Sequence, residues 1–150
     1  MKTQAQDADI LDLSLDSFSD ADTAEMNVIV GGKPSGWLWT FTGPGHPQTI
    51  AQSNRISRDR LHKEKLIEQA RVNGRKWVAP EETPEGVRAG NVTFVIERLV
   101  GWSAIRIDGT DYPFSEENAN KLLSDPKRVG LLAQALEFIA NDQAFTKRSV

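Results

Sequence analysis

The two histidines, His46 and His62, are the residues best suited to acid–base catalysis or metal binding. His46 lies among glycines and prolines, and His62 lies in a strongly polar stretch, so the two lack the spacing of a metal-ligand pair. The chain has no cysteine, which excludes disulfides, thiolate nucleophiles and zinc–thiolate sites. We therefore expect neither a metal site nor a cofactor.

Other catalytic patterns are incomplete. The serines lack a Gly-x-Ser-x-Gly elbow, and residues 31–35 (Gly-Gly-Lys-Pro-Ser) lack the spacing of a phosphate-binding loop. Glu116 and Glu117 cannot share a catalytic site, because adjacent helical positions point about 100° apart. A position in the first turn of a helix, where negative charge is favourable, explains these two residues better. We therefore predict no catalytic residues and a protein that is not an enzyme.

The composition indicates one globular domain. With 150 residues the chain can bury a core, although a hydrophobic content of 39% leaves much polar surface. It shows neither a signal-peptide pattern at its start nor an apolar run of transmembrane length. We therefore expect a soluble cytoplasmic protein with no membrane contact.

Residues 1–25 form an acidic segment that is poor in aromatic residues, the composition of a flexible arm. Leu11, Leu13 and Leu15 alternate with polar residues, which is typical of a strand, and Phe18 follows. Two interpretations stay open: an unstructured solvated tail, or an arm that docks on a partner as a strand or a short motif. Deleting residues 1–25 is expected to leave thermal stability nearly unchanged.

Residues 26–42 are predicted to form a β-hairpin, with a strand at residues 28–30 and a loop at residues 31–36. Trp37, Trp39 and Phe41 then lie on one face of the return strand, because side chains alternate along a strand. The favoured interpretation is a sheet face that packs on the helices, since large apolar patches are seldom exposed. A platform that binds a partner is the alternative.

The spacing of apolar residues and helix signals predicts four helices. A polar helix at residues 47–72 should bury a narrow apolar stripe, and a loop at residues 75–83 contains Trp77. A core helix should follow from Thr83 to the stop at Gly101, and helices at residues 115–124 and 126–140 complete the set. Residues expected to face the core are Val92, Val95, Ile96, Leu99 and Val100 in the second helix and Val129, Leu132, Leu136 and Ile139 in the last.

The segment from Trp102 to Tyr112 is expected to be extended around a turn at Asp108-Gly109. The fold class is therefore α+β and mainly α: about four helices packed with a short aromatic β-hairpin, preceded by an acidic arm. We expect two parts, a flexible arm at residues 1–25 and a single domain at residues 26–150.

Residues 51–80 contain eight basic and three acidic residues, whereas acidic residues predominate in the arm. Such a helix suits a nucleic-acid-binding hypothesis, but acidic residues interrupt it and the pI is about 5.4. A solvated helix face is the favoured interpretation, and we expect no nucleic-acid partner. A third interpretation places the acidic arm of one subunit on the basic helix of another, giving a salt-sensitive homo-oligomer.

Several segments occur in an order that resembles a known family. They are Gly-Trp at residues 101–102, Asp-Gly at 108–109, YPFSEENANKLLSDP at 112–126 and AFTKRS at 144–149, preceded by GPGHP at 43–47 and VNGRKW at 72–77. Together they resemble the tail assembly chaperones of long-tailed bacteriophages, over residues 26–150. The resemblance implies a small helical protein of the host bacterial cytoplasm that binds the hydrophobic tape-measure protein and helps recruit tail-tube proteins.

A chaperone of this kind needs apolar anchors amid polar surface. The candidate partner-binding residues are Leu11, Leu13, Leu15, Phe18, Trp37, Trp39, Phe41, Trp77 and Trp102. Two other functions stay open: a structural virion component of the tail or head–tail connector, and a nucleic-acid-binding phage regulator.

Overall fold

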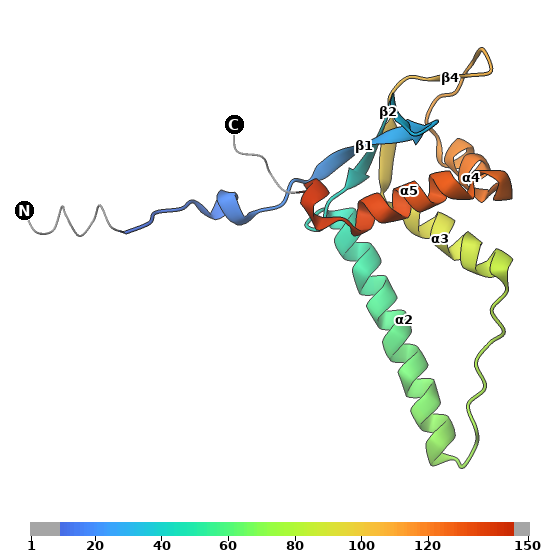
Figure 1. Cartoon of the computed structure of the whole chain (residues 1–150). Coiled ribbons are helices and arrows are strands. Elements are labelled where there is room, and N and C mark those ends of the chain that lie inside the picture. The colour runs from blue at the N-terminus through green and yellow to red at the C-terminus, as the bar shows by residue number, and fades with distance from the viewer. Residues whose placement is uncertain (1–9, 146–150) are drawn as a thin grey trace, which may run out of the picture.

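The computed structural model describes residues 10–145, apart from the side chains of residues 142 and 143. These residues form a mainly helical α+β domain with four α-helices and a small antiparallel sheet, which confirms the predicted α+β class and the number of helices (Figure 1). The strands are β1 (Thr23–Val30), β2 (Lys33–Thr42), β3 (Leu99–Trp102), β4 (Arg106–Ile107) and β5 (Thr110–Asp111). The α-helices are α2 (Pro47–Val72), α3 (Pro84–Arg98), α4 (Glu116–Ser124) and α5 (Val129–Ala140), with short 3-10 turns at Leu15–Phe18, Pro126–Arg128 and Asp142–Phe145.

The main sheet has the order β1-β2-β3, and both strand pairs are antiparallel. Gly31 and Gly32 have φ angles of 61° and 78° and form a two-residue turn, whose twist matches that of the flanking strands. The predicted six-residue loop at 31–36 was therefore wrong, because residues 33–36 already belong to β2. Gly36 keeps a positive φ of 87°, and its N–H donates to Asn27 Oδ1 at 2.8 Å.

β1 begins at Thr23, inside the range expected for the arm. The residues just before it are also bonded to the domain: the Ala21 N–H donates to the Phe145 carbonyl at 2.7 Å, and the Gly43 N–H donates to the Asp22 carbonyl at 2.7 Å. The attachment of the N-terminal segment therefore begins at about residue 21.

These bonds change the expected effect of shortening the chain. Removing residues 1–19 is expected to shift Tm by less than about 2 °C, since the residues removed from 10 onward are almost all exposed. Removing residues 1–25 cuts into β1 and both hydrogen bonds, and it is expected to lower Tm by about 5 °C or more. Thermal unfolding followed by circular dichroism compares the two truncations, and equal Tm values would contradict the boundary.

One core joins the inner face of the sheet to α3, α4 and α5. Its buried apolar side chains come from every one of these elements and from the end of the described chain: Met26, Val28, Trp37, Trp39, Phe41, Val92, Val95, Leu99, Ala119, Leu122, Leu123, Leu132, Ala135, Ile139 and Phe145. Aromatic rings run through this core without interruption, because Phe41 contacts Phe138 and Phe138 contacts Phe145, with centroids 5.6 and 5.7 Å apart.

α2 leads away from this core, and the chain returns to α3 through residues 73–83 (Figure 1). The helix begins after the cap residue His46, whose Nδ1 accepts the Gln48 N–H at 3.1 Å, and it ends at the predicted Asn73-Gly74. Only Thr49 and Gln52 of this helix are buried. The narrow buried stripe was therefore a wrong prediction: Ile50, Ile56, Leu61, Leu66 and Ile67 are all exposed. None of the described helices is long and apolar enough to cross a bilayer.

An ion pair ties α2 to α3. The Arg55 guanidinium donates two hydrogen bonds to the Glu97 carboxylate, one of them from Nη2 to Oε1 at 2.8 Å. This hydrogen bonding holds the pKa of Glu97 below its usual range. Since folding lowers that pKa, the pair stabilises the fold at neutral pH, and the stabilisation is lost as the pH falls through the lowered value.

Glu97→Gln is therefore expected to lower Tm by a few degrees at pH 7, because both partners are partly solvated. The difference between the two proteins should shrink as the pH falls through the acidic range and disappear once Glu97 is protonated in the folded protein. Thermal unfolding from pH 7 to pH 3 measures this. Glu81→Gln, in the exposed loop, serves as the matched control, and a gap that widened on acidification would refute the assignment.

The boundary between α3 and β3 differs from the prediction. The helix ends at Arg98, so Leu99 and Val100 lie in a strand, where Leu99 is buried and Val100 is exposed. Arg98 itself is buried, and its Nη2 donates to the Thr42 carbonyl at 2.6 Å. Burial lowers the pKa of this guanidinium. The helical pattern stops here because β2 has a free edge that Leu99–Trp102 pairs with.

The C-terminal elements follow the predicted order. The Ser115 side chain accepts the Asn118 N–H at 3.0 Å and caps α4, as expected. The Asp125 carboxylate accepts the Lys127 N–H at 2.9 Å, which lowers its pKa and stabilises a 3-10 turn. α5 therefore begins at Val129 rather than at residue 126. Val129, predicted to face the core, is exposed instead, whereas Leu132 and Ile139 are buried as expected.

Candidate partner-binding site

Three of the predicted partner-binding residues are part of the core. Trp39 and Phe41 are 0% exposed and Trp37 is 9% exposed. They alternate along β2 on the face that packs against the helices. These three residues therefore do not form an exposed platform, and the packing interpretation of the aromatic strand is the one that the structure supports.

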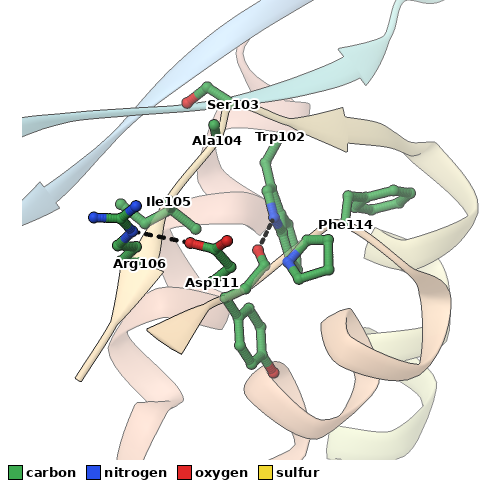
Figure 2. Close-up of a pocket in the computed structure, with 9 residues that line it drawn as sticks. Trp102, Ser103, Ala104, Ile105, Arg106, Asp111 and Phe114 are labelled. Carbon is green, nitrogen blue, oxygen red and sulfur yellow. Dashed lines mark hydrogen bonds and ion pairs between the residues drawn. The ribbon is translucent and has the colours of Figure 1, made fainter. Parts of the chain in front are cut away.

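The largest hollow beside the remaining candidates lies next to Trp102. It has a volume of about 660 Å³ and is formed by the end of β3, the β4–β5 hairpin and the segment leading into α4. Figure 2 shows the Arg106–Asp111 pair on one side, Phe114 on the other and Trp102 between them. The residues that line it are Trp102, Ser103, Ala104, Ile105, Arg106, Asp111, Tyr112, Pro113 and Phe114.

Trp102 lines this hollow and also packs on the core. Its ring stacks on Trp39 on the core side and on Tyr112 on the hairpin side, with centroids 5.2 and 5.9 Å apart. Its indole Nε1 donates to the Tyr112 carbonyl at 3.0 Å (Figure 2). Phe114 meets the Trp102 ring edge-on at 5.0 Å. The floor of the hollow is therefore a half-buried aromatic cluster that packs on the core.

The hairpin above the floor is fixed by local chemistry. Asp108 and Gly109 have φ angles of 52° and 79°, which give the tight turn predicted at this dipeptide. The Tyr112 N–H donates to the Ile105 carbonyl at 3.0 Å and closes the base of the hairpin. On the other side, the Ser103 N–H donates to the Leu38 carbonyl at 2.8 Å, so the segment leaving β3 stays attached to the main sheet.

The rim of the hollow is charged, while its floor is apolar. Arg106 Nε donates to Asp111 Oδ1 at 2.9 Å, and both side chains are largely exposed. Ala104 and Pro113 are exposed beside them. This arrangement suits an apolar side chain that enters between polar neighbours, which is the usual division between the centre and the rim of a protein interface.

Sequence reasoning identified Trp102 here but missed Ile105, Tyr112 and Phe114 as parts of the same site. The Asp108-Gly109 turn was the available signal, because a tight turn brings the residues on its two sides together. Pattern alone could not show that Phe114, beyond the hairpin, turns back onto Trp102.

Trp77 lies at a second hollow, of about 570 Å³, between α2 and the extended segment at residues 77–82. The Lys63 ammonium is 5.4 Å from the centroid of the Trp77 ring, a cation–π contact. Trp77 is half-buried and so is neither a core residue nor a free anchor.

The apolar residues of the arm are exposed. Leu11, Leu13, Leu15 and Phe18 expose 80%, 52%, 87% and 69% of their surface. Despite their alternation with polar residues, the three leucines do not form a strand. Leu11 and Leu13 precede a 3-10 turn at Leu15–Phe18, and Leu15 is the first residue of that turn. These four residues are the least buried of all the predicted candidates.

Within residues 10–145, no group of three or more His, Asp or Glu side chains is placed to hold a metal ion. Comparison of the chain with protein-family models, with curated proteins and with solved structures found no match.

Proposed function

We propose that this protein is a non-enzymatic tail assembly chaperone that binds a tape-measure protein and helps bring tail-tube subunits to it. The proposal combines the order of segments over residues 26–150, which resembles that family, with the aromatic hollow beside Trp102. The hollow is the observation that carries it. A recess with an apolar floor that is open to solvent can receive an apolar side chain of a partner that has a hydrophobic surface.

The size and chemistry of the hollow suit a protein side chain. Its volume of about 660 Å³ falls within the range of small-ligand sites, and its floor is built from three aromatic rings. Aromatic side chains in a preformed recess contribute much of the affinity of protein interfaces. Arg106 and Asp111 at the rim can pair with polar residues that flank an apolar anchor on the partner.

The hollow beside Trp77 provides a separate surface for a second protein. The β4–β5 hairpin and the far end of α2 lie at opposite ends of the molecule (Figure 1). A chaperone that brings a tape-measure protein and a tube subunit together needs two such contacts that do not overlap. We assign the tape-measure protein to the hollow beside Trp102, and the tube subunit to the hollow beside Trp77.

Filling the first hollow tests the assignment. Ala104→Trp places a large side chain in the recess from an exposed position, and it is expected to weaken binding of the tape-measure protein by about tenfold or more. Ala89→Trp, at an exposed site on α3, is the matched control. Both variants and the natural protein are used as bait in a pull-down from infected cells, followed by titration of the purified partner. Equal binding by all three proteins would refute the site.

Mass spectrometry of purified particles tests the function itself. A chaperone should be absent from particles while the tape-measure protein appears in the pull-down. Presence in particles at fixed copy number would instead make this protein a structural component of the tail or connector. Salt-sensitive binding of DNA or RNA, with no tape-measure protein in the pull-down, would make it a nucleic-acid-binding regulator.

A further inference from the structure

Two exposed segments of this chain have complementary chemistry. The first is the arm, defined here as residues 10–22, in which Asp12, Asp16, Asp20 and Asp22 alternate with exposed apolar residues and no basic residue occurs. An exposed apolar segment of this length is unusual on a monomeric protein that binds no partner. The arm therefore has the composition of a segment that binds something basic and partly apolar.

The second segment is the outer face of α2, defined here by Ile50, Arg58, Leu61, Lys65 and Val72. The three apolar residues are spaced by about three helical turns each, so they lie along one line of the helix. They expose 47%, 58% and 75% of their surface. Arg58 and Lys65 lie on the same face, one turn before and one turn after Leu61. Glu68 also lies on this face, one turn before Val72, and Arg71 pairs with it at 2.7 Å, so Arg58 and Lys65 are its unpaired charges among the described residues.

The outer face has no partner within the described chain. Neither Arg58 nor Lys65 forms an ion pair with any of residues 10–145. The returning segment packs on another side of α2, where Asp59, His62, Lys63 and Leu66 line the hollow with Trp77. The line through Ile50, Leu61 and Val72 is therefore left open to solvent.

We propose that the arm of a second copy of this chain binds the outer face of α2, and that two copies exchange arms in a symmetric dimer. The acidic residues of the arm then face Arg58 and Lys65, and its leucines cover the apolar line on the helix. Reciprocal exchange is the simplest closed arrangement, because a two-fold axis uses both contacts twice and leaves neither unpaired. This inference does not depend on the proposed function.

The way in which the arm is anchored favours its binding to α2 of a second copy over its binding to α2 of the same molecule. The hydrogen bonds of Ala21 and Asp22 to Phe145 and Gly43 fix the direction in which the arm leaves the domain. Figure 1 shows that it leads away from α2. The lengths are also comparable: residues 10–20, which precede the anchored pair, span at most about 36 Å when extended, and the line from Ile50 to Val72 is about 33 Å long. One arm can therefore cover the outer face of α2 of a neighbouring molecule.

The oligomeric state of the full chain tests the proposal. Sedimentation velocity at about 50 mM salt is expected to show a dimer that dissociates as the salt concentration rises to about 500 mM, because ion pairs at an exposed interface are screened. A helix variant, Arg58→Glu with Lys65→Glu, and an arm variant, Asp12→Lys with Asp20→Lys, should each be monomeric at the lower salt concentration. Lys33→Glu with Lys127→Glu changes the net charge as the helix variant does, at exposed sites elsewhere, and should remain dimeric.

Mixing the two variants tests whether the arm of one copy contacts the helix of another, and the size of the complex distinguishes a closed dimer from an open chain. The acidic helix of one variant matches the basic arm of the other, and the unchanged segments match as well, so a heterodimer should form although neither variant dimerises alone. Combining all four substitutions in one chain should restore a homodimer. Circular dichroism checks that each variant is folded. A natural protein that is monomeric at low salt, variants that still dimerise, or a mixture that stays monomeric would each overturn the proposal.

Discussion

Trp39→Ala is expected to lower the free energy of unfolding by about 3–5 kcal/mol, the range for truncating a fully buried aromatic side chain. Trp39 is fully buried, pairs with Met26 on β1 and with Trp102 on β3, and stacks on the Trp102 ring. Its removal leaves a cavity at the centre of the sheet. Since domains of this size are stable by only about 5–15 kcal/mol, a Tm lower by about 10 °C or more should follow.

Urea unfolding followed by far-ultraviolet circular dichroism measures this change without depending on tryptophan fluorescence. Trp77→Ala is the matched control, because Trp77 is half-buried at the surface of α2 and should cost much less. Trp39→Phe should lie between the two, since the indole N–H that it removes is buried without a hydrogen-bond partner among the described residues. If Trp39→Ala cost no more than Trp77→Ala, the aromatic strand would not be core.

Gly43→Ala is expected to destabilise the protein by about 2–3 kcal/mol through overpacking. A Cβ at residue 43 would lie 2.2 Å from the Ala21 carbonyl oxygen and 3.2 Å from the Phe145 ring. The nearest obstacle is backbone, so the added methyl group must push the start of β1 away from the domain. The substitution should also weaken the hydrogen bond from Gly43 to Asp22.

Gly45→Ala supplies the comparison, because no atom lies within 4 Å of a Cβ at residue 45. Two glycines of one short segment should therefore differ clearly in their tolerance of the same change. Thermal unfolding measures the stability, and amide hydrogen exchange at residues 21–25 reports whether the start of β1 has detached. Equal stability of the two variants would show that residue 43 is not in close contact with residue 21.

The proposed dimer and the hollow beside Trp102 place their contacts on different parts of the chain. Arm exchange uses residues 10–22 and the outer face of α2, and it leaves the hairpin at residues 106–111 free. A dimer would then present two hollows at once. Two linked sites bind a long partner more tightly than one, because the second contact forms at a high effective concentration.

Local signals in the sequence determined where α2 and α4 begin and end and where the small hairpin turns. Pro47 and Asn73-Gly74 set the limits of α2, Asp108-Gly109 predicted the small hairpin, and Ser115 predicted the cap of α4. These predictions succeeded because capping and tight turns depend on residues within a few positions of one another. Trp102, one of the candidate residues predicted from the sequence, lies beside the hollow.

Contacts between distant residues decided the rest. The helical spacing of Leu99 and Val100 was overruled because β2 offered an edge for a third strand, so packing prevailed over local pattern. The spacing of the apolar residues of α2 predicted a buried stripe, but after Gln52 the helix leaves the core and these residues are exposed among residues 10–145. Which aromatic residues are buried depends on the packing of the helices on β2, and which glycine cannot carry a side chain depends on how Ala21, Gly43 and Phe145 meet. The sequence of a single segment does not indicate which distant residues will contact it, so only the tertiary structure could show these contacts.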